Sequence, residues 1–285
     1  MINQVAVAGA GTMGSGIALS VALSGRKVIL FDVQETMLEK ARGAVSKNLD
    51  VLHQKGKVSS SGRDETRERI TYTADIDKVV ADLVIEAIVE KLSAKVDLFT
   101  KLAHLNSPDT IFASNTSSLS ISAIQKDIPN PARVAGLHYF NPAQVMKLVE
   151  VIKGDQTSEE VIRQLLQFTR EQNKIPVVCN DSPGFIVNRV ARHFYLESMK
   201  LVEDGIATPE EVDLVLESSG FKMGPFKLMD MIGMDINLAV TESLYEAFDK
   251  HIRFTPSPLQ IQKVRDGELG RKTGKGFYNY NNLQS

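Results

Sequence analysis

The stretch GAGTMG, at residues 9 to 14, constrains what this chain can fold into more than any other feature of the sequence. It ends the β-branched run QVAVAG and opens a segment, TMGSGIALSVALSG, whose apolar residues suit a helix. A G-x-G-x-x-G pattern between a strand and a helix is typical of a dinucleotide-binding βαβ unit. Gly9 permits the tight turn, Gly11 lets the backbone approach a pyrophosphate, and Gly14 lets the helix pack closely on the strand. Thr12 and Met13 lie between these glycines at the helix N-terminus, which favours an anion, and complete the predicted set.

A second run, KVILFD at residues 27 to 32, follows the predicted helix and ends in an acidic residue. At the position of Asp32, a carboxylate accepts hydrogen bonds from the ribose hydroxyls of a bound dinucleotide. The next residue is Val33 rather than an arginine, so the 2′-phosphate of NADP would face an unshielded carboxylate. We therefore predict that the cofactor is NAD rather than NADP.

Short β-branched runs alternate with amphipathic segments through the first half of the chain. This pattern predicts an α/β domain built on a Rossmann-type, doubly wound and mostly parallel sheet. Residues 157 to 172 begin with a Thr/Ser cap and an acidic first turn and carry apolar residues at helical spacing, so we expect a helix there. The predicted strands are QVAVAG (4 to 9), KVILFD (27 to 32), DLVIEAI (82 to 88), TIFASN (110 to 115), VAGLHYF (134 to 140) and IPVVC (175 to 179).

The connection after Asp32 is longer than a βαβ crossover requires. Residues 35 to 57 have the pattern of a helix, and we interpret the segment VSSSGRDETRER that follows as a polar loop, because it is rich in serine, glycine and charge. We expect this connection, over about residues 35 to 70, to project from the sheet as a helical arm.

The stretch NDSPG, at residues 180 to 184, is a turn signal, and the pattern beyond it changes. A long helix closed by Gly205 is followed by a second helix with Thr208 as its N-cap and Pro209 at its first position. We therefore predict an NAD-binding Rossmann domain with a helical arm over residues 1 to 183. An all-helical domain is predicted over residues 184 to 285.

Composition excludes several classes of function for this chain of 285 residues. A net charge of -2 argues against a binder of nucleic acid or of a membrane surface, which would need a strongly basic face. The N-terminus has no basic segment followed by a cleavage site, and no run of about 18 apolar residues is present, so we predict a cytoplasmic protein. Cys179 is the single cysteine, which rules out an intrachain disulfide; we predict a buried thiol and no metal site.

Polar residues follow three of the predicted strands: Glu86 and Glu90, residues 114 to 118 (SNTSS), and His138. Ligands of open α/β sheets bind at these carboxyl ends of the strands. Only five residues separate Asn141 from the apolar alternation KLVEV, so the chain is expected to turn back antiparallel. The same register would place His138 opposite Glu150. A carboxylate there would orient the imidazole and stabilise its cation, so that the histidine could act as a general base on a substrate alcohol.

Several motifs together resemble the 3-hydroxyacyl-CoA dehydrogenase family, and most of all its short bacterial 3-hydroxybutyryl-CoA dehydrogenases. They run nearly from end to end in the expected order: VAVAGAGTMGSGIA, LVIEAIVE, ASNTSSLSI, RVAGLHYFNPAQVMKLVEVI, DSPGFIVNR, MGPFKLMDMIGMD and RKTGKGFYNY. The resemblance implies an NAD-dependent oxidoreductase that interconverts (S)-3-hydroxyacyl-CoA, of short chain, and 3-ketoacyl-CoA. It implies that His138 is the catalytic base and Glu150 its partner. Ser117 would contact both substrate and nicotinamide, and Asn188 would position the substrate.

The resemblance also implies a wider set of contacts and an assembly. Asn48 and Lys55 on the arm occupy positions that contact the acyl-CoA substrate in the family, where animal members carry a serine in place of Asn48. A homodimer formed through the helical domain is expected, with no nucleic acid or membrane as partner. The implied cofactor-binding residues are Gly9, Gly11, Thr12, Met13, Gly14, Asp32, Glu90, Lys95, Asn115, Ser117, Asn141 and Lys272.

Two other functions stay open at this point. One is a dinucleotide-binding or structural protein that keeps the fold without turnover, against which the intact set of Ser117, His138, Glu150 and Asn188 argues. The other is a dehydrogenase for a 3-hydroxy acid that carries no CoA. Acyl chain length cannot be read from the sequence, since one methylene group changes binding by only about 1 to 3 kcal/mol.

Overall fold

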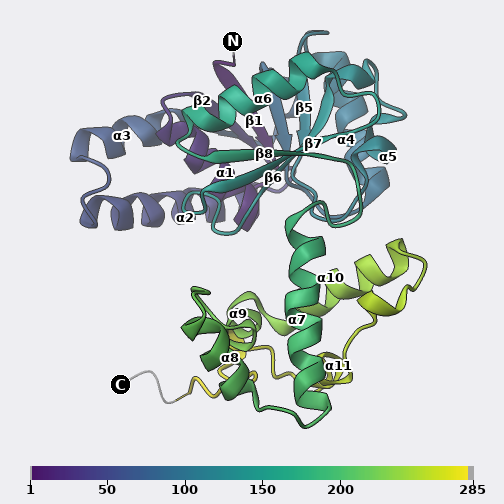
Figure 1. Cartoon of the computed structure of the whole chain (residues 1–285). Coiled ribbons are helices and arrows are strands. Elements are labelled where there is room, and N and C mark those ends of the chain that lie inside the picture. Colours follow the sequence, from purple (N-terminus) through teal and green to yellow (C-terminus); the bar gives the residue numbers. More distant parts are fainter. Residues whose placement is uncertain (1, 282–285) are drawn as a thin grey trace. The chain divides into compact units, whose positions relative to one another are not determined.

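The computed structural model describes residues 2 to 281 of the chain. It divides into two compact units, Met1–Ser182 and Pro183–Ser285. The first unit is built on a sheet of eight strands with helices packed against it, and the second consists of helices joined by loops (Figure 1). The predicted class, an α/β domain followed by a helical domain, is confirmed.

The sheet has the strand order β3-β2-β1-β4-β5-β6-β7-β8. The first six strands of this order run parallel, β7 is antiparallel to β6, and β8 is parallel to β7. The order reverses between β1 and β4, and in doubly wound sheets this reversal opens a crevice at the carboxyl ends of the two strands. The strands are β1 Gln4–Ala8, β2 Lys27–Phe31, β3 Ile70–Thr73, β4 Leu83–Glu86, β5 Ile111–Ser114, β6 Val134–Tyr139, β7 Leu148–Lys153 and β8 Ile175–Asn180.

Burial on both faces explains why the central strands have continuous apolar sequences. In β1 the residues from Val5 to Ala8 have no exposed surface, and all four residues of β4 are buried. Helix α1 packs on this part of the sheet and is itself buried over most of its length. Parallel strands need this cover because neither face can be left to water.

The helices of the first unit begin at capping residues that the sequence provides. Ser158 accepts a hydrogen bond from the amide of Val161 and caps α6, as the sequence predicted. Gly25 has a φ of 90° immediately after the end of α1, in the left-handed region expected at that position. The helices are α1 Thr12–Leu23, α2 Glu35–Gln54, α3 Ser60–Glu68, α4 Leu92–Leu105, α5 Ile121–Gln125 and α6 Glu159–Glu171, with short 3-10 helices η1 Ile76–Lys78 and η2 Pro131–Arg133.

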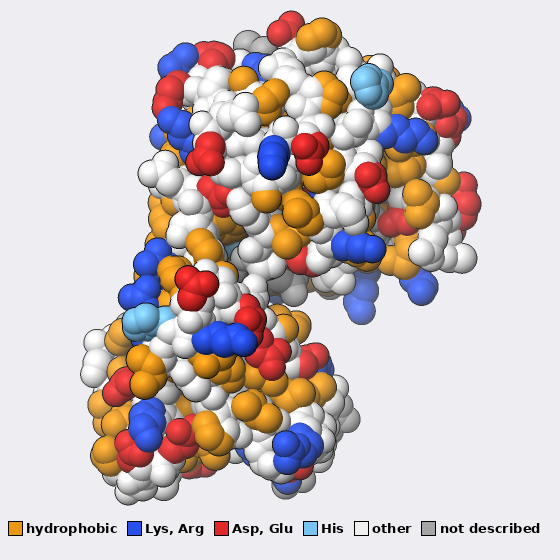
Figure 2. All heavy atoms as spheres, turned by 90° about the vertical axis from the view of Figure 1, so that its right-hand side faces the viewer, with side chains coloured by type: hydrophobic (Ala, Val, Ile, Leu, Met, Phe, Trp, Pro, Cys, Tyr) orange, Lys and Arg blue, Asp and Glu red, His pale blue; other side chains and the backbone are white. Residues whose placement is uncertain are grey.

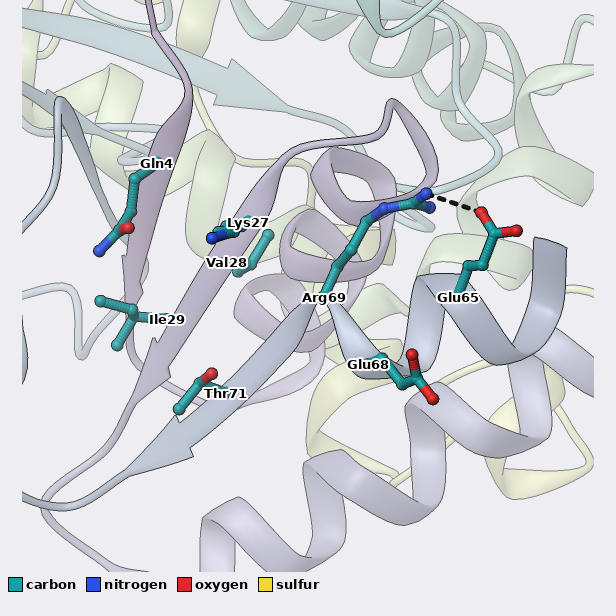
Figure 3. A pocket seen from close by; sticks show the side chains of 8 residues that line it. All are labelled: Gln4, Lys27, Val28, Ile29, Glu65, Glu68, Arg69 and Thr71. Carbon is teal, nitrogen blue, oxygen red and sulfur yellow. Dashed lines mark hydrogen bonds and ion pairs between the residues drawn. The ribbon is translucent and has the colours of Figure 1, made fainter. Parts of the chain in front are cut away.

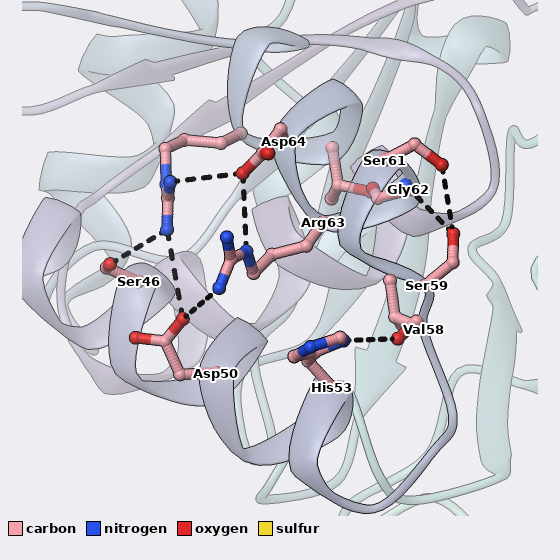
Figure 4. A network of polar contacts seen from close by, with 11 residues as sticks. Ser46, Asp50, His53, Val58, Ser59, Ser61, Gly62, Arg63 and Asp64 are labelled. Atoms are coloured by element: carbon pink, nitrogen blue, oxygen red, sulfur yellow. Dashed lines mark hydrogen bonds and ion pairs between the residues drawn. The ribbon is translucent and has the colours of Figure 1, made fainter.

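The polar segment after α2 is a helix, and its interpretation as a loop was wrong. Ser59 caps α3 by accepting a hydrogen bond from the amide of Gly62. Arg63 then reaches back to Asp50 of α2, 3.4 Å between Nη1 and Oδ1, and His53 contacts the carbonyl oxygen of Val58 at 2.9 Å (Figure 4). The first contact joins α3 to α2, and the second joins α2 to the connection between the two helices. Polar contacts thus hold the two helices together in place of the apolar stripe that the sequence lacks here. The chain then enters β3, a strand that the sequence analysis missed.

The second unit packs its helices around a small apolar core that includes Met199, Phe226 and Met229. Thr208 and Glu211 form a reciprocal capping box at the start of α8, with Pro209 at the first helical position, as the sequence predicted for the cap and the proline. Asp230, which is buried, accepts hydrogen bonds from the amides of Phe277 and Tyr278 and so anchors the C-terminal segment. The helices are α7 Val187–Glu203, α8 Pro209–Ser218, α9 Pro225–Ile232, α10 Met234–Ala247 and α11 Pro258–Arg265, with η3 Ile252–Phe254 and η4 Arg271–Thr273.

Large apolar side chains are exposed on both units and lie among charged ones (Figure 2). On the second unit, Leu214 and Val215 of α8 are more than half exposed. The homodimer expected through this unit stays a prediction. Among residues 2 to 281, no helix combines the length and the apolar character that crossing a membrane requires.

The glycines of the first turn offer a matched pair of substitutions. A Cβ added to Gly14 would lie 1.7 Å from the carbonyl oxygen of Gly9, whereas one added to Gly11 meets nothing within 4 Å. We expect Gly14→Ala to lower the free energy of unfolding by at least about 2 kcal/mol, because helix and turn must separate. Gly11→Ala should leave stability unchanged and weaken NADH binding instead. Urea denaturation and NADH titration check both, and equal stability of the two variants would contradict this account of the turn.

Candidate active site

The candidate active site of the first unit lies at the carboxyl ends of β1, β4, β5 and β6. The chain segments that leave these strands approach one another closely there. A Cβ added to Gly9, which has a φ of 103°, would lie 2.5 Å from the carbonyl oxygen of Ala87, after β4. Glycine at this position therefore lets the loop after β1 meet the loop after β4.

The glycine loop fits the phosphates of a dinucleotide. Gly11 is the N-cap residue of α1 and supplies no capping side chain, so no side chain competes with an anion for the amides of the first turn. Asp32 lies beside this loop, where Oδ2 accepts a hydrogen bond from the amide of Ala10 at 2.8 Å and Oδ1 one from the amide of Gln34 at 3.0 Å. These bonds hold the carboxylate at the end of β2, the position that binds ribose in dinucleotide folds.

A second carboxylate, Glu86 at the end of β4, is fully buried and connects three segments of the site. It accepts hydrogen bonds from Nζ of Lys95 and from Oγ of Ser114, both at 2.6 Å, and from the amide of Ile88 at 2.7 Å. Lys95 is buried on α4. Each charge is thus compensated and hydrogen bonded, as burial requires.

Glu90 joins the same network from the loop after β4. One oxygen lies 3.0 Å from Nζ of Lys95, and the other accepts hydrogen bonds from the hydroxyl of Thr116 and, at 3.1 Å, from the amide of Ser117. Burial raises the pKa of Glu90, but the charge of Lys95 and hydrogen bonds from Thr116, Lys95 and Ser118 outweigh it, so this pKa lies below its ordinary value. Glu90 is therefore a carboxylate at neutral pH and holds the loop that carries Ser117.

His138 and Glu150 face each other across the antiparallel pair of β6 and β7, in the register that the sequence predicted. Nδ1 of His138 lies 2.8 Å from Oε2 of Glu150. The two residues are 6% and 1% exposed, so this bond is shielded from water. An ionised carboxylate can only accept hydrogen bonds, which requires Nδ1 to carry the proton and leaves the lone pair on Nε2. The arrangement is that of a base oriented by a carboxylate.

The structure brings most of the predicted residues of the first unit to one edge of the sheet. Asn115 joins β5 to β6 through a hydrogen bond, 2.8 Å, from the amide of Tyr139 to its Oδ1. Asn141 is exposed directly after β6. The residues gathered along this edge are Gly9, Gly11, Thr12, Met13, Gly14, Asp32, Glu90, Lys95, Asn115, Ser117, His138, Asn141 and Glu150.

Four other predicted residues lie elsewhere. Asn48 is half-buried on α2, and Lys55 is exposed at the C-terminal cap of that helix. In the second unit, Asn188 lies in the first turn of α7 and Lys272 lies in η4, where it pairs with Asp235. Their contacts with substrate or cofactor stay predictions.

Glu86 was predicted only as a polar strand end, and its hydrogen bonds to Lys95 and Ser114 were not predicted. The available signal was an acidic residue ending an apolar run nine residues before Lys95, in addition to the serine that ends the next strand. Cys179 is half-buried rather than buried as predicted, because β8 is the edge strand. Burial and the charges of Glu150 and Asp181 raise its pKa to about 12, so this thiol stays neutral. Among the described residues, no three His, Cys, Asp or Glu side chains gather in a way that could hold a metal ion.

Comparison with known families matches both units. Residues 4–182 match the family model described as 3-hydroxyacyl-CoA dehydrogenase, NAD binding domain. Residues 184–280 match the model described as 3-hydroxyacyl-CoA dehydrogenase, C-terminal domain. The two matches together cover nearly the whole chain and meet where the two compact units divide.

Individual relatives agree with these matches. The chain is 46% identical to 3-hydroxyadipyl-CoA dehydrogenase of Escherichia coli over 98% of its own length, and it spans 59% of that longer relative. It is 41% identical to a probable 3-hydroxybutyryl-CoA dehydrogenase of Deinococcus radiodurans, covering 96% of this chain and 99% of the relative. A crystal structure of (S)-3-hydroxybutyryl-CoA dehydrogenase from Ralstonia eutropha superposes with a TM-score of 0.93 at 36% identity, covering 98% of this chain and 99% of that one.

Replacing Glu86 tests whether the buried network supports the site. We expect Glu86→Gln to lower the free energy of unfolding by about 1 to 3 kcal/mol, because the buried ammonium of Lys95 loses its fully buried carboxylate partner while Glu90 stays beside it. Glu171→Gln is the control, since Glu171 forms an ion pair with Arg26 at the surface and its loss should cost less than about 1 kcal/mol. Urea denaturation measures both changes. A loss at Glu86 no larger than that at Glu171 would contradict the account.

Proposed function

The chain belongs to the 3-hydroxyacyl-CoA dehydrogenase family, and we propose that it interconverts (S)-3-hydroxyacyl-CoA and 3-ketoacyl-CoA with His138 as the general base. The observation that carries this proposal is the buried hydrogen bond between Nδ1 of His138 and Glu150. It leaves Nε2 as the basic nitrogen at the carboxyl end of β6, the edge to which the glycine loop also belongs.

The proposed reaction follows from this tautomer. In the oxidative direction, Nε2 of His138 takes the proton of the substrate C3 hydroxyl as the C3–H bond breaks. Glu150 stabilises the imidazolium that results, because its carboxylate already accepts the Nδ1 proton. In the reductive direction the imidazolium returns this proton to the C3 oxygen. General acid–base catalysis of this kind contributes about 10² to 10⁴ in rate.

NAD, when bound, supplies the group that accepts the hydride from C3 or returns it. The residues that would hold it are the glycine loop, with Thr12 and Met13, and Asp32 at the ribose. Glu90, Lys95, Asn115, Ser117 and Asn141 would serve the nicotinamide end, because they lie between the ends of β4 and β6. From the second unit, the family resemblance assigns Lys272 to the cofactor.

For the substrate, we propose Ser117 and Asn188 as the residues that position the reacting end of the acyl chain. Asn48 and Lys55 would contact the CoA portion on the arm, where Lys55 is exposed and can meet a phosphate. A short chain such as 3-hydroxybutyryl-CoA is the substrate for which the relatives from Deinococcus radiodurans and Ralstonia eutropha are named, and we propose it here. The Escherichia coli relative is named for a substrate with a second carboxylate, 3-hydroxyadipyl-CoA.

Activity with NADH and acetoacetyl-CoA, followed by nicotinamide absorbance, tests the role of the histidine pair. We expect His138→Ala and Glu150→Gln each to lower kcat by at least about 10² while NADH binding is retained, because the proton transfer and not the cofactor site is lost. His104→Asn is the control, since His104 is exposed on α4, and should keep normal turnover. Turnover near that of the wild type in either of the first two variants would refute the assigned roles.

Two comparisons of rates define the specificity. Asp32 predicts a lower KM for NADH than for NADPH, because its carboxylate would repel a 2′-phosphate. Rates on the CoA esters of 3-hydroxybutyrate, longer 3-hydroxy acids and 3-hydroxyadipate give the preferred chain, and free 3-hydroxybutyrate should react far more slowly than its ester. A lower KM for NADPH, or equal rates on acid and ester, would contradict the proposal.

A further inference from the structure

A hollow of about 440 Å³ lies in the first unit, near the C-terminal ends of three of its helices. Leu23 of α1, Leu52 of α2 and Asn173 after α6 line it. Four cationic residues also line it: Lys57, Arg69, Lys147 and Lys174. Among the described residues, no carboxylate lines it. A second hollow of about 510 Å³, beside the first residues of β1, β2 and β3, mixes Lys27 and Arg69 with Glu65 and Glu68 (Figure 3).

One of these cations, Lys147, meets the end of a helix. The last carbonyl groups of a helix lack partners within the helix and carry partial negative charge. Nζ of Lys147 donates to the carbonyl oxygen of Asn173 at 2.9 Å, directly after α6. The charge of Lys147 is therefore met by a helix end, whereas the guanidinium of Arg69 pairs with the carboxylate of Glu65 at 2.9 Å.

Lys174 differs from the other three because it is buried, with 7% of its surface exposed. Its Nζ donates to the carbonyl oxygens of Ala143 at 2.6 Å and Met146 at 2.8 Å. Both carbonyls belong to the connecting segment 142–146, which joins Asn141 after β6 to the start of β7. The ammonium group of Lys174 thus forms hydrogen bonds near both ends of the connecting segment, which lies between His138 and Glu150 in the chain.

The connecting segment also packs against the helix that begins at the glycine loop. A Cβ added to Gly16 of α1 would lie 3.0 Å from Oε1 of Gln144 and 3.3 Å from Cβ of Ala143. Gln172, two residues before Lys174, donates to the hydroxyl of Tyr139 at 3.0 Å and supports the end of β6. The segment therefore lies between the cofactor helix and the strand pair that carries the catalytic residues.

We propose that Lys174 is a positioning residue, which holds the connecting segment so that Asn141 and His138 keep their places relative to the cofactor helix. This inference rests on the proposed function, because it assigns a role to Lys174 in that reaction. Without the two hydrogen bonds, the segment would move relative to α1. Displacement of reacting groups by about 1 Å can cost up to about 10² in rate.

The surroundings of Lys174 make its charge sensitive to pH. Burial, with the nearby charge of Lys147, lowers the pKa of Lys174 to about 8. The other ionisable groups around the hollow are Lys57 and Arg69, and Tyr139 lies beneath the ammonium, 5.7 Å from Nζ to the ring centroid. Burial raises the pKa of that phenol well above its ordinary value, so Tyr139 stays neutral. Lys174 therefore loses its charge, and part of its hold on the two carbonyls, as the pH rises through about 8.

Lys174→Met tests the proposal, with Lys147→Met as the matched control. With acetoacetyl-CoA and NADH at pH 7, we expect Lys174→Met to lower kcat about tenfold. Its Kd for NADH should stay within about threefold, because the glycine loop is intact. Lys147→Met should keep kcat within about twofold, because Nζ of Lys147 donates to the carbonyl oxygen of Asn173 after α6.

The pH dependence separates positioning from a merely structural role. The ratio of wild-type kcat to that of Lys174→Met should fall as the pH rises through about 8, because only the wild type loses the ammonium charge. In Lys147→Met this fall should move to higher pH, because a repelling charge is gone.

Several outcomes would overturn the proposal: normal kcat in Lys174→Met, a kcat ratio that does not change with pH, or an equal loss in Lys147→Met. If Lys174→Met does not fold, the wild type and Lys147→Met are compared by the pH at which kcat has fallen to half its maximum on the alkaline side. The same midpoint pH in both proteins rejects the proposal. Absence of turnover in the wild type would instead reject the proposed function. The outcomes with the lysine variants do not bear on that function.

Discussion

The geometry of the site depends on one buried hydrogen bond, between Glu150 and His138. An ionised carboxylate inside a sheet is stable only with a partner that donates to it, and the antiparallel register of β6 and β7 supplies this partner directly opposite. The connecting segment 142–146 between the strands sets that register, and Lys174 donates hydrogen bonds to two of its carbonyl oxygens. Because the buried carboxylate of Glu150 needs a donor, the imidazole of His138 is oriented toward it. This imidazole lies at the edge of the sheet where the glycine loop begins.

Two carboxylates, Glu86 and Glu150, are buried at this edge and do different work because their partners differ. Lys95 offers Glu86 an ammonium group, which can only donate, so this pair forms a fixed support for the loops after β4 and β5. His138 offers Glu150 an imidazole, which can carry a proton or accept one. The first pair therefore suits scaffolding and the second suits proton transfer.

The parts of the fold that follow from local chemistry could be predicted from the sequence. The glycine turn, the helix caps and the register of His138 with Glu150 each depend on a few neighbouring residues. Helix α3 was missed because polar contacts across the arm, such as that of Arg63 with Asp50, stabilise it rather than an apolar stripe. The role of Lys174 could not be predicted from the sequence. Its hydrogen-bond partners lie about thirty residues earlier in the chain and are backbone carbonyls, which every residue has.

The tautomer of His138 is the most direct test of this account. Nitrogen NMR of protein labelled at histidine, assigned by the signal lost in His138→Ala, reports which ring nitrogen carries the proton when the imidazole is neutral. We expect a proton on Nδ1 in the wild type, and a mixture of tautomers in Glu150→Gln, because an amide can donate as well as accept. A wild-type imidazole protonated on Nε2 with a bare Nδ1 would contradict it, since the base would then face Glu150 instead of the substrate.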